Sequence, residues 1–410
     1  MFVAKKSNGS IISLLHSYQR EEAQNASLLF CPACSSEVIL KKGSKRQWHF
    51  AHKISSLCSS QNEPETEEHL AGKQRLYYWL KKQGLPVFLE HTLPVTKRRA
   101  DLYLPLAPRP VAIEFQCASM TDEECLNRTR DYLKEGVWPV WIFSLQRFRS
   151  RHPMSLEGIT SLYSFEWIPL RESVSLSHRF LIYYSPAQQR FHFLFPLTSL
   201  SSRRTFYQQT LLHETELSFS HLFNPPVPTK PPTVLFPAWM KVKKQWRYGR
   251  KNNREGIVYN EVNKLFASHY RDSSLFSAEA GWPIVNKEEL ITKPLWWQSW
   301  LLFFLSTCVK EGRTIKEKTL WQEFNGRMEE NGFQKRVLPL LTRHDEYLFI
   351  YIRFIEKAGL VEEVEKGVWK QKRSLYLPSS LDEGYFLDVK ISKAFFSFFS
   401  SFDAWQKKNT

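Results

Sequence analysis

A chain of 410 residues is long for a single domain, so two or three domains are expected. Apolar residues make up 42% of the chain, enough to build hydrophobic cores, whereas its six cysteines are too few for a disulfide scaffold. The formal net charge of +16 indicates a polyanionic partner, either nucleic acid or an acidic membrane surface, and does not bear on the fold.

The first residues, MFVAKKSNGSIISLL, contain no continuous apolar core and no small-residue cleavage site. We therefore expect no signal peptide, and the cytoplasm is the expected compartment.

Residues 1–62 are polar and rich in Cys and His, and they are predicted to form a zinc-finger-like segment. A close Cys pair followed by His and Cys fits tetrahedral zinc ligation in a reducing compartment. Four protein ligands leave no open position, so the zinc would be structural and would supply folding free energy. The alternative is incidental clustering. The predicted ligands are Cys31, Cys34, His52 and Cys58, with His49 as a substitute for His52.

Residues 63–150 alternate between helical and strand patterns, which is typical of an α/β layer. The stretch ETEEHLAGKQRLYYWLKKQG has acids in its first turn, lysines in its last and a closing Gly84, so it is predicted to be a helix. A second helix is expected from Thr121, as N-cap, through TDEECLNRTRDYLKEG. The predicted strands are LPVFLEHTL, KRRADLYLPL, VAIEFQCAS and VWPVWIFS.

The positions of several acidic side chains in this layer indicate a candidate metal site. Glu114 and Gln116 share one face of their strand, and a hairpin would bring Asp101 of the preceding strand beside Glu114. Two adjacent carboxylates repel each other unless a cation lies between them, so the pair is a candidate Mg²⁺ site for metal-assisted phosphodiester hydrolysis. Glu65 and Glu68 on the first helix are candidates for a further ligand.

Each residue also has a structural explanation when it is taken alone. Glu114 could face water, Asp101 could pair with Arg98 or Arg99, and the helix acids could simply favour the helix N-terminus. Their serial order along the chain makes the metal-site interpretation stronger than any single residue does.

The motifs CPAC, WHFAH, ETEEHLAGK, RRADLYL, AIEFQCAS, RTRDY and VWPVWIF, with Cys58, occur in this order. In the order of these motifs, the chain resembles the CoiA-like competence proteins, whose central domain belongs to the PD-(D/E)XK nuclease superfamily. The resemblance is dense over residues 30–145 and looser elsewhere. It implies a restriction-endonuclease-like central domain, a mixed sheet flanked by helices.

Carried over to this sequence, the resemblance puts the superfamily's metal-binding Asp at Asp101, its Glu at Glu114 and its helix Glu at Glu68. The superfamily's lysine position falls on Gln116, which can orient water or phosphate but carries no charge. The implied cofactor is Mg²⁺ or Mn²⁺. The implied role is processing or recombination of incoming single-stranded DNA in natural transformation, with a RecA-type recombinase as candidate partner. The alternative is a non-catalytic single-stranded DNA-binding accessory factor for recombination.

Residues 150–222 read mainly as β structure, with a hairpin in HRFLIYYSPAQQRFHFLFPL around the turn SPAQQ. Six prolines then mark residues 223–238 as a linker. The expected organisation is a zinc-binding segment, a nuclease-like domain, the linker and a mainly helical C-terminal domain, at residues 1–62, 63–222, 223–238 and 239–410.

A basic and aromatic run, WMKVKKQWRYGRKNNR, opens the C-terminal region at residues 239–254. Cations neutralise phosphates and aromatic rings stack on bases, so the run suits single-stranded nucleic acid, with a solvated basic face as the alternative. Arg128, one turn from Tyr132 on the second helix, is a further candidate for phosphate contact, the alternative being packing and an ion pair. The candidates in the run are Lys241, Lys243, Lys244, Trp246, Arg247, Arg250 and Lys251.

The most apolar run, PLWWQSWLLFFLSTCV at residues 294–309, is shorter than the roughly 20 residues of a membrane span. We predict a buried helix and no stable membrane insertion. An interfacial helix is the alternative, and with it a membrane-surface scaffold as a third class of function. Residues 347–377 read as a helix, a strand, a turn at Gly367 and a basic strand, a winged-helix-like candidate, and residues 395–402 as core.

Overall fold

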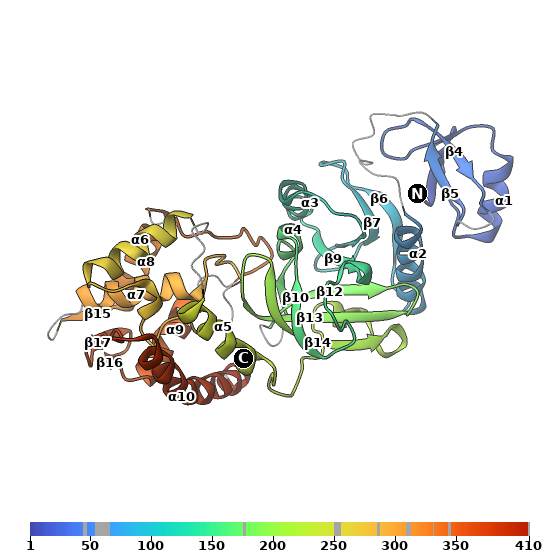
Figure 1. The fold of residues 1–410 in the computed structure, drawn as a ribbon. Coiled ribbons are helices and arrows are strands. Elements are labelled where there is room, and N and C mark those ends of the chain that lie inside the picture. Colours follow the sequence, from blue (N-terminus) through green and yellow to red (C-terminus); the bar gives the residue numbers. More distant parts are fainter. Residues whose placement is uncertain are drawn as a thin grey trace.

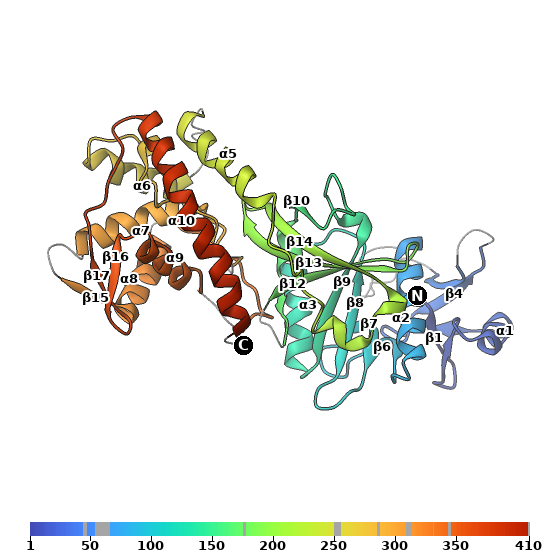
Figure 2. The same cartoon turned by 90° about the horizontal axis from the view of Figure 1, so that it is seen from below.

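The computed structural model describes residues 1–43, 47–53, 66–174, 178–249, 256–284, 288–308, 313–330, 332–342 and 346–408. Three units follow one another along the chain, each built on its own sheet, and they lie in a row in both views (Figures 1 and 2). We call them the N-terminal unit (β1 to β5), the central unit (α2 to β14) and the C-terminal unit (α5 to α10).

The N-terminal unit is a five-stranded sheet in the order β2-β1-β3-β4-β5, with one helix. Its apolar side chains, Phe2, Ile12 and Phe50 among them, join one hydrophobic cluster with Leu70 and Tyr77 of the central unit. The unit is therefore packed onto its neighbour and does not bury its core alone. The elements are β1 (Val3–Lys6), β2 (Ile11–Ser13), α1 (Ser17–Asn25), β3 (Leu29–Phe30), β4 (Glu37–Lys41) and β5 (His49–His52).

The central unit contains the mixed sheet that the sequence predicts. Strand β9 runs parallel to both β8 and β12, and the other neighbours are antiparallel. The strand order is β10-β14-β13-β12-β9-β8-β7-β6, with β11 beside β12. The strands are β6 (Phe88–Thr92), β7 (Arg99–Leu104), β8 (Val111–Gln116), β9 (Trp138–Ser144), β10 (Glu157–Ser161), β11 (Arg171–Glu172), β12 (Arg179–Ser185), β13 (Arg190–Ser199) and β14 (Arg204–His213).

Helices cover both faces of this sheet (Figure 1). Alternate residues of β9 show it: Val140 and Ile142 join the cluster that contains α2, whereas Trp141 and Phe143 pack with α3 and α4. The side chain of Thr121 accepts a hydrogen bond from Glu124 N, which confirms it as the N-cap of α3. The elements are α2 (Glu67–Lys82), α3 (Asp122–Lys134), η1 (Leu145–Arg147), α4 (Ser164–Trp167), η2 (Glu214–Glu216) and η3 (Phe219–Leu222).

The proline-rich segment runs along the central unit. The hydroxyl of Thr210 donates to Pro226 O at 2.7 Å, and the side-chain amide of Gln208 donates to Lys230 O at 2.9 Å. Helix α5 already begins at Leu235, so the last residues of the predicted linker are helical.

The C-terminal unit is mainly helical, as predicted, and includes a three-stranded sheet in the order β15-β17-β16. The predicted helix, strand and turn at Gly367 are present as α9, β16 and β17. The elements are α5 (Leu235–Tyr248), α6 (Gly256–Ser268), η4 (Ser273–Leu275), α7 (Pro294–Cys308), β15 (Thr314–Lys316), α8 (Glu317–Glu330), α9 (Glu346–Lys357), β16 (Val361–Glu365), β17 (Val368–Gln371) and α10 (Leu381–Lys408).

The apolar run at residues 294–309 forms α7, and Trp297 and Leu301 on it are fully buried in the core of the C-terminal unit. The prediction of a buried helix is confirmed, and the interfacial alternative loses its basis. In the part of the chain that the structure describes, no helix is both long and apolar enough to cross a membrane.

Candidate functional site

The two predicted carboxylates lie on the neighbouring strands β7 and β8. The antiparallel pairing of β7 with β8 runs as far as Leu102 and Ile113, and Asp101 and Glu114 are the residues next to this last pair. Both residues are buried, with 8% and 1% of their surface exposed. The predicted hairpin therefore does bring these two residues onto neighbouring strands.

Asp101 is surrounded by hydrogen-bond donors. Its Oδ2 accepts from Phe115 N at 2.9 Å and lies 3.1 Å from His69 Nε2, and its Oδ1 lies 3.9 Å from Lys73 Nζ. Burial alone would raise the pKa of Asp101, but these three neighbours together hold it well below its usual range. Asp101 is thus kept ionised despite its burial.

Glu114 is held from helix α3. The Arg128 guanidinium donates to its Oε2, and the Tyr132 hydroxyl donates to its Oε1. Burial raises the pKa of Glu114 above its usual value, although Arg128 opposes this. Of the two interpretations of Arg128, phosphate contact or packing with an ion pair, the structure shows the ion pair, with Glu114. Arg128 and Tyr132, four residues apart on α3, both reach this carboxylate.

The other two predicted catalytic residues lie nearby with different partners. The Gln116 amide donates to Ala118 O at 2.8 Å, and Glu68 Oε1 accepts from Ser144 Oγ at 2.9 Å. Burial, and then the carboxylates of Glu68 and Asp101, raise the pKa of the Cys117 thiol above its usual value. Both carboxylates therefore act electrostatically on Cys117. Glu65 lies outside the described residues.

The donor chemistry of this pair fits a hard cation. Mg²⁺ commonly uses one or two carboxylates and keeps several waters, and Asp101 and Glu114 supply two carboxylates from adjacent strands. Both oxygens of Glu114 already accept hydrogen bonds, so ligation by it requires Arg128 or Tyr132 to be displaced.

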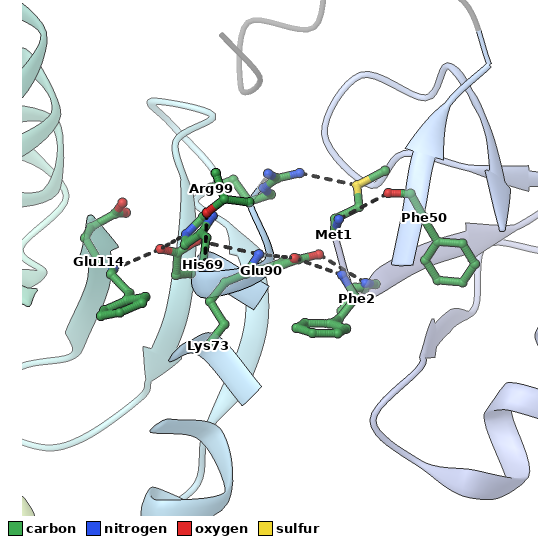
Figure 3. A network of polar contacts seen from close by, with 12 residues as sticks. Met1, Phe2, Phe50, His69, Lys73, Glu90, Arg99 and Glu114 are labelled. Carbon is green, nitrogen blue, oxygen red and sulfur yellow. Dashed lines mark hydrogen bonds and ion pairs between the residues drawn. The ribbon is translucent and has the colours of Figure 1, made fainter. Parts of the chain in front are cut away.

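Three residues near Asp101 were not recognised from the sequence as part of the site (Figure 3). His69 and Lys73 come from α2, and Glu90 lies within β6 with a φ of 49°. A signal for Lys73 was present, because it lies on the apolar stripe of α2 between Leu70 and Tyr77, where a solvated lysine is not expected.

The predicted zinc ligands converge in the N-terminal unit. Candidate ligand atoms of Cys31, Cys34 and His52 all lie within 4.8 Å of one another. Among the described residues, these three form the one group of at least three His, Cys, Asp or Glu side chains that could hold a metal ion. The Cys34 Sγ to His52 Nε2 distance is 3.3 Å. His49 instead lies with its Nδ1 2.9 Å from Gln47 O, so His52 is the histidine of the cluster, as preferred.

A tight turn brings the two cysteines together. Ser35 has a φ of 58°, and its N–H donates to Cys31 O at 2.9 Å. Two thiols and an imidazole are ligands that zinc accepts, so the donor set fits this metal. Cys58, the fourth predicted ligand, lies outside the described residues.

The basic helix α5 has a different role from the one expected for two of its cations. Lys243 and Arg247 are buried, and both bind Asp388 of α10, at 2.9 Å and 2.6 Å. Burial lowers the pKa of Lys243 to about 8. The expectation that these two residues contact nucleic acid is corrected, because they face the core together with the buried Trp239, four residues earlier.

The remaining candidates on this run are divided between the surface and undescribed positions. Lys241 and Lys244 are exposed and Trp246 is half-buried. Arg250 and Lys251 lie outside the described residues.

Comparisons with known proteins match all three units. Models of competence protein CoiA match as its N-terminal domain at residues 15–61, its nuclease-like domain at residues 65–227 and its C-terminal domain at residues 236–384. Competence protein CoiA of Bacillus subtilis (strain 168) is 26% identical over 344 residues, which cover 83% of this chain and 88% of that relative. No solved structure matches the chain. With its three parts matched in order, the chain belongs to the competence protein CoiA family.

Proposed function

We propose that this protein acts in natural transformation, in the cytoplasm, by processing incoming single-stranded DNA or promoting its recombination. The observation that carries the proposal is the buried pair Asp101 and Glu114 on adjacent strands, inside a region matched by a nuclease-like domain model. The proposed fold of this domain is restriction-endonuclease-like, of the PD-(D/E)XK type. The proposed boundaries are residues 1–62, 63–222, 223–238 and 239–410.

The chemistry assigned to the site is metal-assisted hydrolysis of a phosphodiester. Mg²⁺ or Mn²⁺, when bound, would lower the pKa of a water and polarise the phosphate. Asp101 and Glu114 are the proposed ligands, and Glu68, fixed by Ser144, assists them. Gln116 orients water or phosphate once its amide turns from Ala118 O. Because Gln116 brings no positive charge, transition-state stabilisation is expected to be weaker by about 3–4 kcal/mol than with a charged donor.

A cleavage assay tests this function. Labelled single- and double-stranded DNA are incubated with the protein and Mg²⁺ or Mn²⁺, beside the double variant Asp101→Ala, Glu114→Ala. Cleavage should fall by at least about 100-fold in that variant, as when a stabilising group is removed from an active site. The control Asp122→Ala, Glu123→Ala removes two exposed acids from the start of α3 and should cut normally. Metal-dependent cleavage that survives in the first variant would overturn the assignment.

A non-catalytic accessory factor for RecA-type recombination is the second candidate. It is favoured by the occupied oxygens of Glu114 and by the uncharged Gln116. In this case the protein binds single-stranded DNA without cutting it. The proposed contacts on α5 are the exposed Lys241 and Lys244 and the half-buried Trp246.

Fluorescence anisotropy with a labelled oligonucleotide separates binding from cleavage. Lys241→Glu, Lys244→Glu should weaken binding and reduce the salt dependence by roughly two phosphate contacts. The matched control is Lys81→Glu, Lys82→Glu, which reverses two exposed lysines at the end of α2. Equal weakening by both pairs would show non-specific electrostatics and remove α5 as the binding surface.

We further propose a structural zinc held by Cys31, Cys34, His52 and Cys58. The cluster of the first three supports this ligand set. Purified protein should contain one zinc per chain by elemental analysis, and Cys31→Ser should lose most of it, whereas Cys117→Ser, remote from the cluster in sequence, should keep it. An unchanged zinc content in Cys31→Ser would refute the ligand set.

A further inference from the structure

Glu90 is an unusual residue at the junction of the N-terminal and central units. It lies inside strand β6 with a φ of 49°, a backbone conformation that costs free energy for any residue other than glycine. Its carboxylate is also buried, with 2% of the residue exposed. A conformation of this kind persists only where the surroundings hold it firmly, which points to a role for this carboxylate.

Glu90 joins the main chain of one unit to a side chain of the other (Figure 3). Its Oε1 accepts from Phe2 N at 2.9 Å and its Oε2 accepts from Val3 N at 3.0 Å. Its Oε1 also accepts from the ammonium of Lys73 at 2.7 Å. Two amides of the N-terminal unit therefore orient a carboxylate that in turn holds a fully buried cation of α2.

The same ammonium stands near Asp101 without being in hydrogen-bond contact with it. Lys73 Nζ is 2.7 Å from Glu90 Oε1 and 3.9 Å from Asp101 Oδ1. At hydrogen-bond distance a lysine would neutralise the aspartate and compete with a divalent cation for its oxygens. Of these two carboxylates, Glu90 is therefore the one in direct contact with the ammonium.

We propose that Glu90, held by the amides of Phe2 and Val3, keeps the Lys73 ammonium off Asp101 and so leaves that carboxylate able to bind a divalent cation. This rests on the proposed metal-dependent function of Asp101. Glu90 and Lys73 are positioning residues in this scheme, and the docked N-terminal unit sets the charge balance of a site that lies in its neighbour.

Removal of the Glu90 charge has a predictable consequence. A buried ammonium requires a counter-charge, and among the described contacts of Lys73 the carboxylate of Asp101 also lies at ion-pair distance. Lys73 should then turn to Asp101 and block it. Removal of the lysine charge as well should free the aspartate again, which a purely structural role of the pair would not produce.

The test is Mn²⁺ binding to the full-length chain, followed by the electron paramagnetic resonance signal of free Mn²⁺. Binding that depends on Asp101 is isolated by subtracting the Asp101→Ala, Glu114→Ala background. Glu90→Gln should weaken this binding about tenfold, a size typical of coupled neighbouring groups. Glu90→Gln combined with Lys73→Met should restore it to within roughly threefold of the wild type. The control Glu37→Gln, at an exposed ion pair of the N-terminal unit, should leave binding unchanged.

A second pair of variants tests the two amides. Val3→Pro removes the N–H that binds Glu90, and Val3→Ala keeps it, so the first should weaken Mn²⁺ binding relative to the second. Circular dichroism of each variant confirms that it is folded.

The outcomes separate this inference from the proposed function. A wild type without Asp101-dependent Mn²⁺ binding would overturn the proposed function and the inference together. A wild type that binds, with Glu90→Gln unchanged or with no rescue by Lys73→Met, would overturn this inference alone.

Discussion

Arg128 and Tyr132 decide the state of Glu114. The carboxylate is almost completely buried, and a buried carboxylate is stable only when it is paired and hydrogen-bonded. The guanidinium also lies over the Trp141 ring, 5.2 Å from its centre, so it is held from two directions. This pairing makes Glu114 part of the structural core as well as a candidate ligand.

Removal of the guanidinium should therefore cost stability. Arg128→Met leaves Glu114 as an unpaired buried charge, and the free energy of unfolding should fall by about 3–5 kcal/mol in urea titrations. Arg130→Met, on the exposed face of the same helix, should change it by less than about 0.5 kcal/mol. A loss below about 1 kcal/mol for Arg128→Met would contradict a structural ion pair at Glu114.

His192 gives the stability a pH dependence. It is fully buried on β13, with Nδ1 3.2 Å from Gln209 Oε1, and burial lowers its pKa to about 4. The same histidine has a pKa of about 6.5 in the unfolded chain. Between these values the unfolded state binds more protons, so stability falls as the pH drops through this window.

The expected loss from His192 between pH 6.5 and 4 is at most about 3 kcal/mol. Unfolding free energies across this range should show a shallower slope in His192→Gln than in the wild type. Substitution of the exposed His152 by Gln should leave the slope as it is. Identical slopes for all three proteins would show that His192 does not titrate in this window.

At the scale of elements, the site depends on how closely α2 approaches β8. Gly72 faces the Phe115 ring, and a Cβ added to this glycine would lie 1.9 Å from a ring carbon. The same Phe115 donates its N–H to Asp101. The helix can present His69 and Lys73 to Asp101 only because a glycine allows this approach.

Two glycine substitutions in helices should therefore act in opposite directions. Gly72→Ala should lower the thermal stability by about 1–3 kcal/mol through overpacking against Phe115, which outweighs its gain in helix propensity. Gly326→Ala, in α8 with no atom near the new Cβ, should be neutral or raise stability by up to about 1 kcal/mol. Thermal melts of each variant and the wild type measure these changes, and a stabilising effect of Gly72→Ala would contradict the close contact between α2 and β8.

At the scale of the whole molecule, the central and C-terminal units are joined by a buried ion pair. Arg179 Nη1 of β12 lies 2.6 Å from Glu288 Oε2, and both residues are buried. Arg336 adds a hydrogen bond of 2.6 Å to Ser202 O, and the Thr342 hydroxyl donates to Glu172 at 2.8 Å. We expect contacts of this kind to make the two units unfold together.

Glu288→Gln should weaken this coupling. It leaves Arg179 with a reduced counter-charge inside the interface, at a cost approaching about 3–5 kcal/mol. Calorimetry should show the unfolding transition broadening or dividing into two, whereas Glu21→Gln on the exposed face of α1 should leave it unchanged. An unaltered transition in Glu288→Gln would mean that the interface is held mainly by other contacts.

Local patterns were sufficient for much of the fold. The ends of α2 and α3, the strands around Asp101 and Glu114, the hairpin between β12 and β13 and the convergence of Cys31, Cys34 and His52 follow from signals within short stretches. Periodicity, caps and ligand spacing are properties of neighbouring residues, so they are readable without tertiary structure.

The partners of the charged residues followed only from the tertiary structure. Arg247 binds Asp388, 141 positions away, and Glu90 binds amides 87 and 88 positions away. The stripe of Trp239, Lys243 and Arg247 at spacings of four hinted that these cations face inward, but the sequence does not name a distant counter-charge. The sequence by itself therefore determined the family, the elements and the candidate carboxylates. The fold alone decided which charges are buried and which stay exposed to solvent, because the burial of a charge depends on partners that only chain folding brings together.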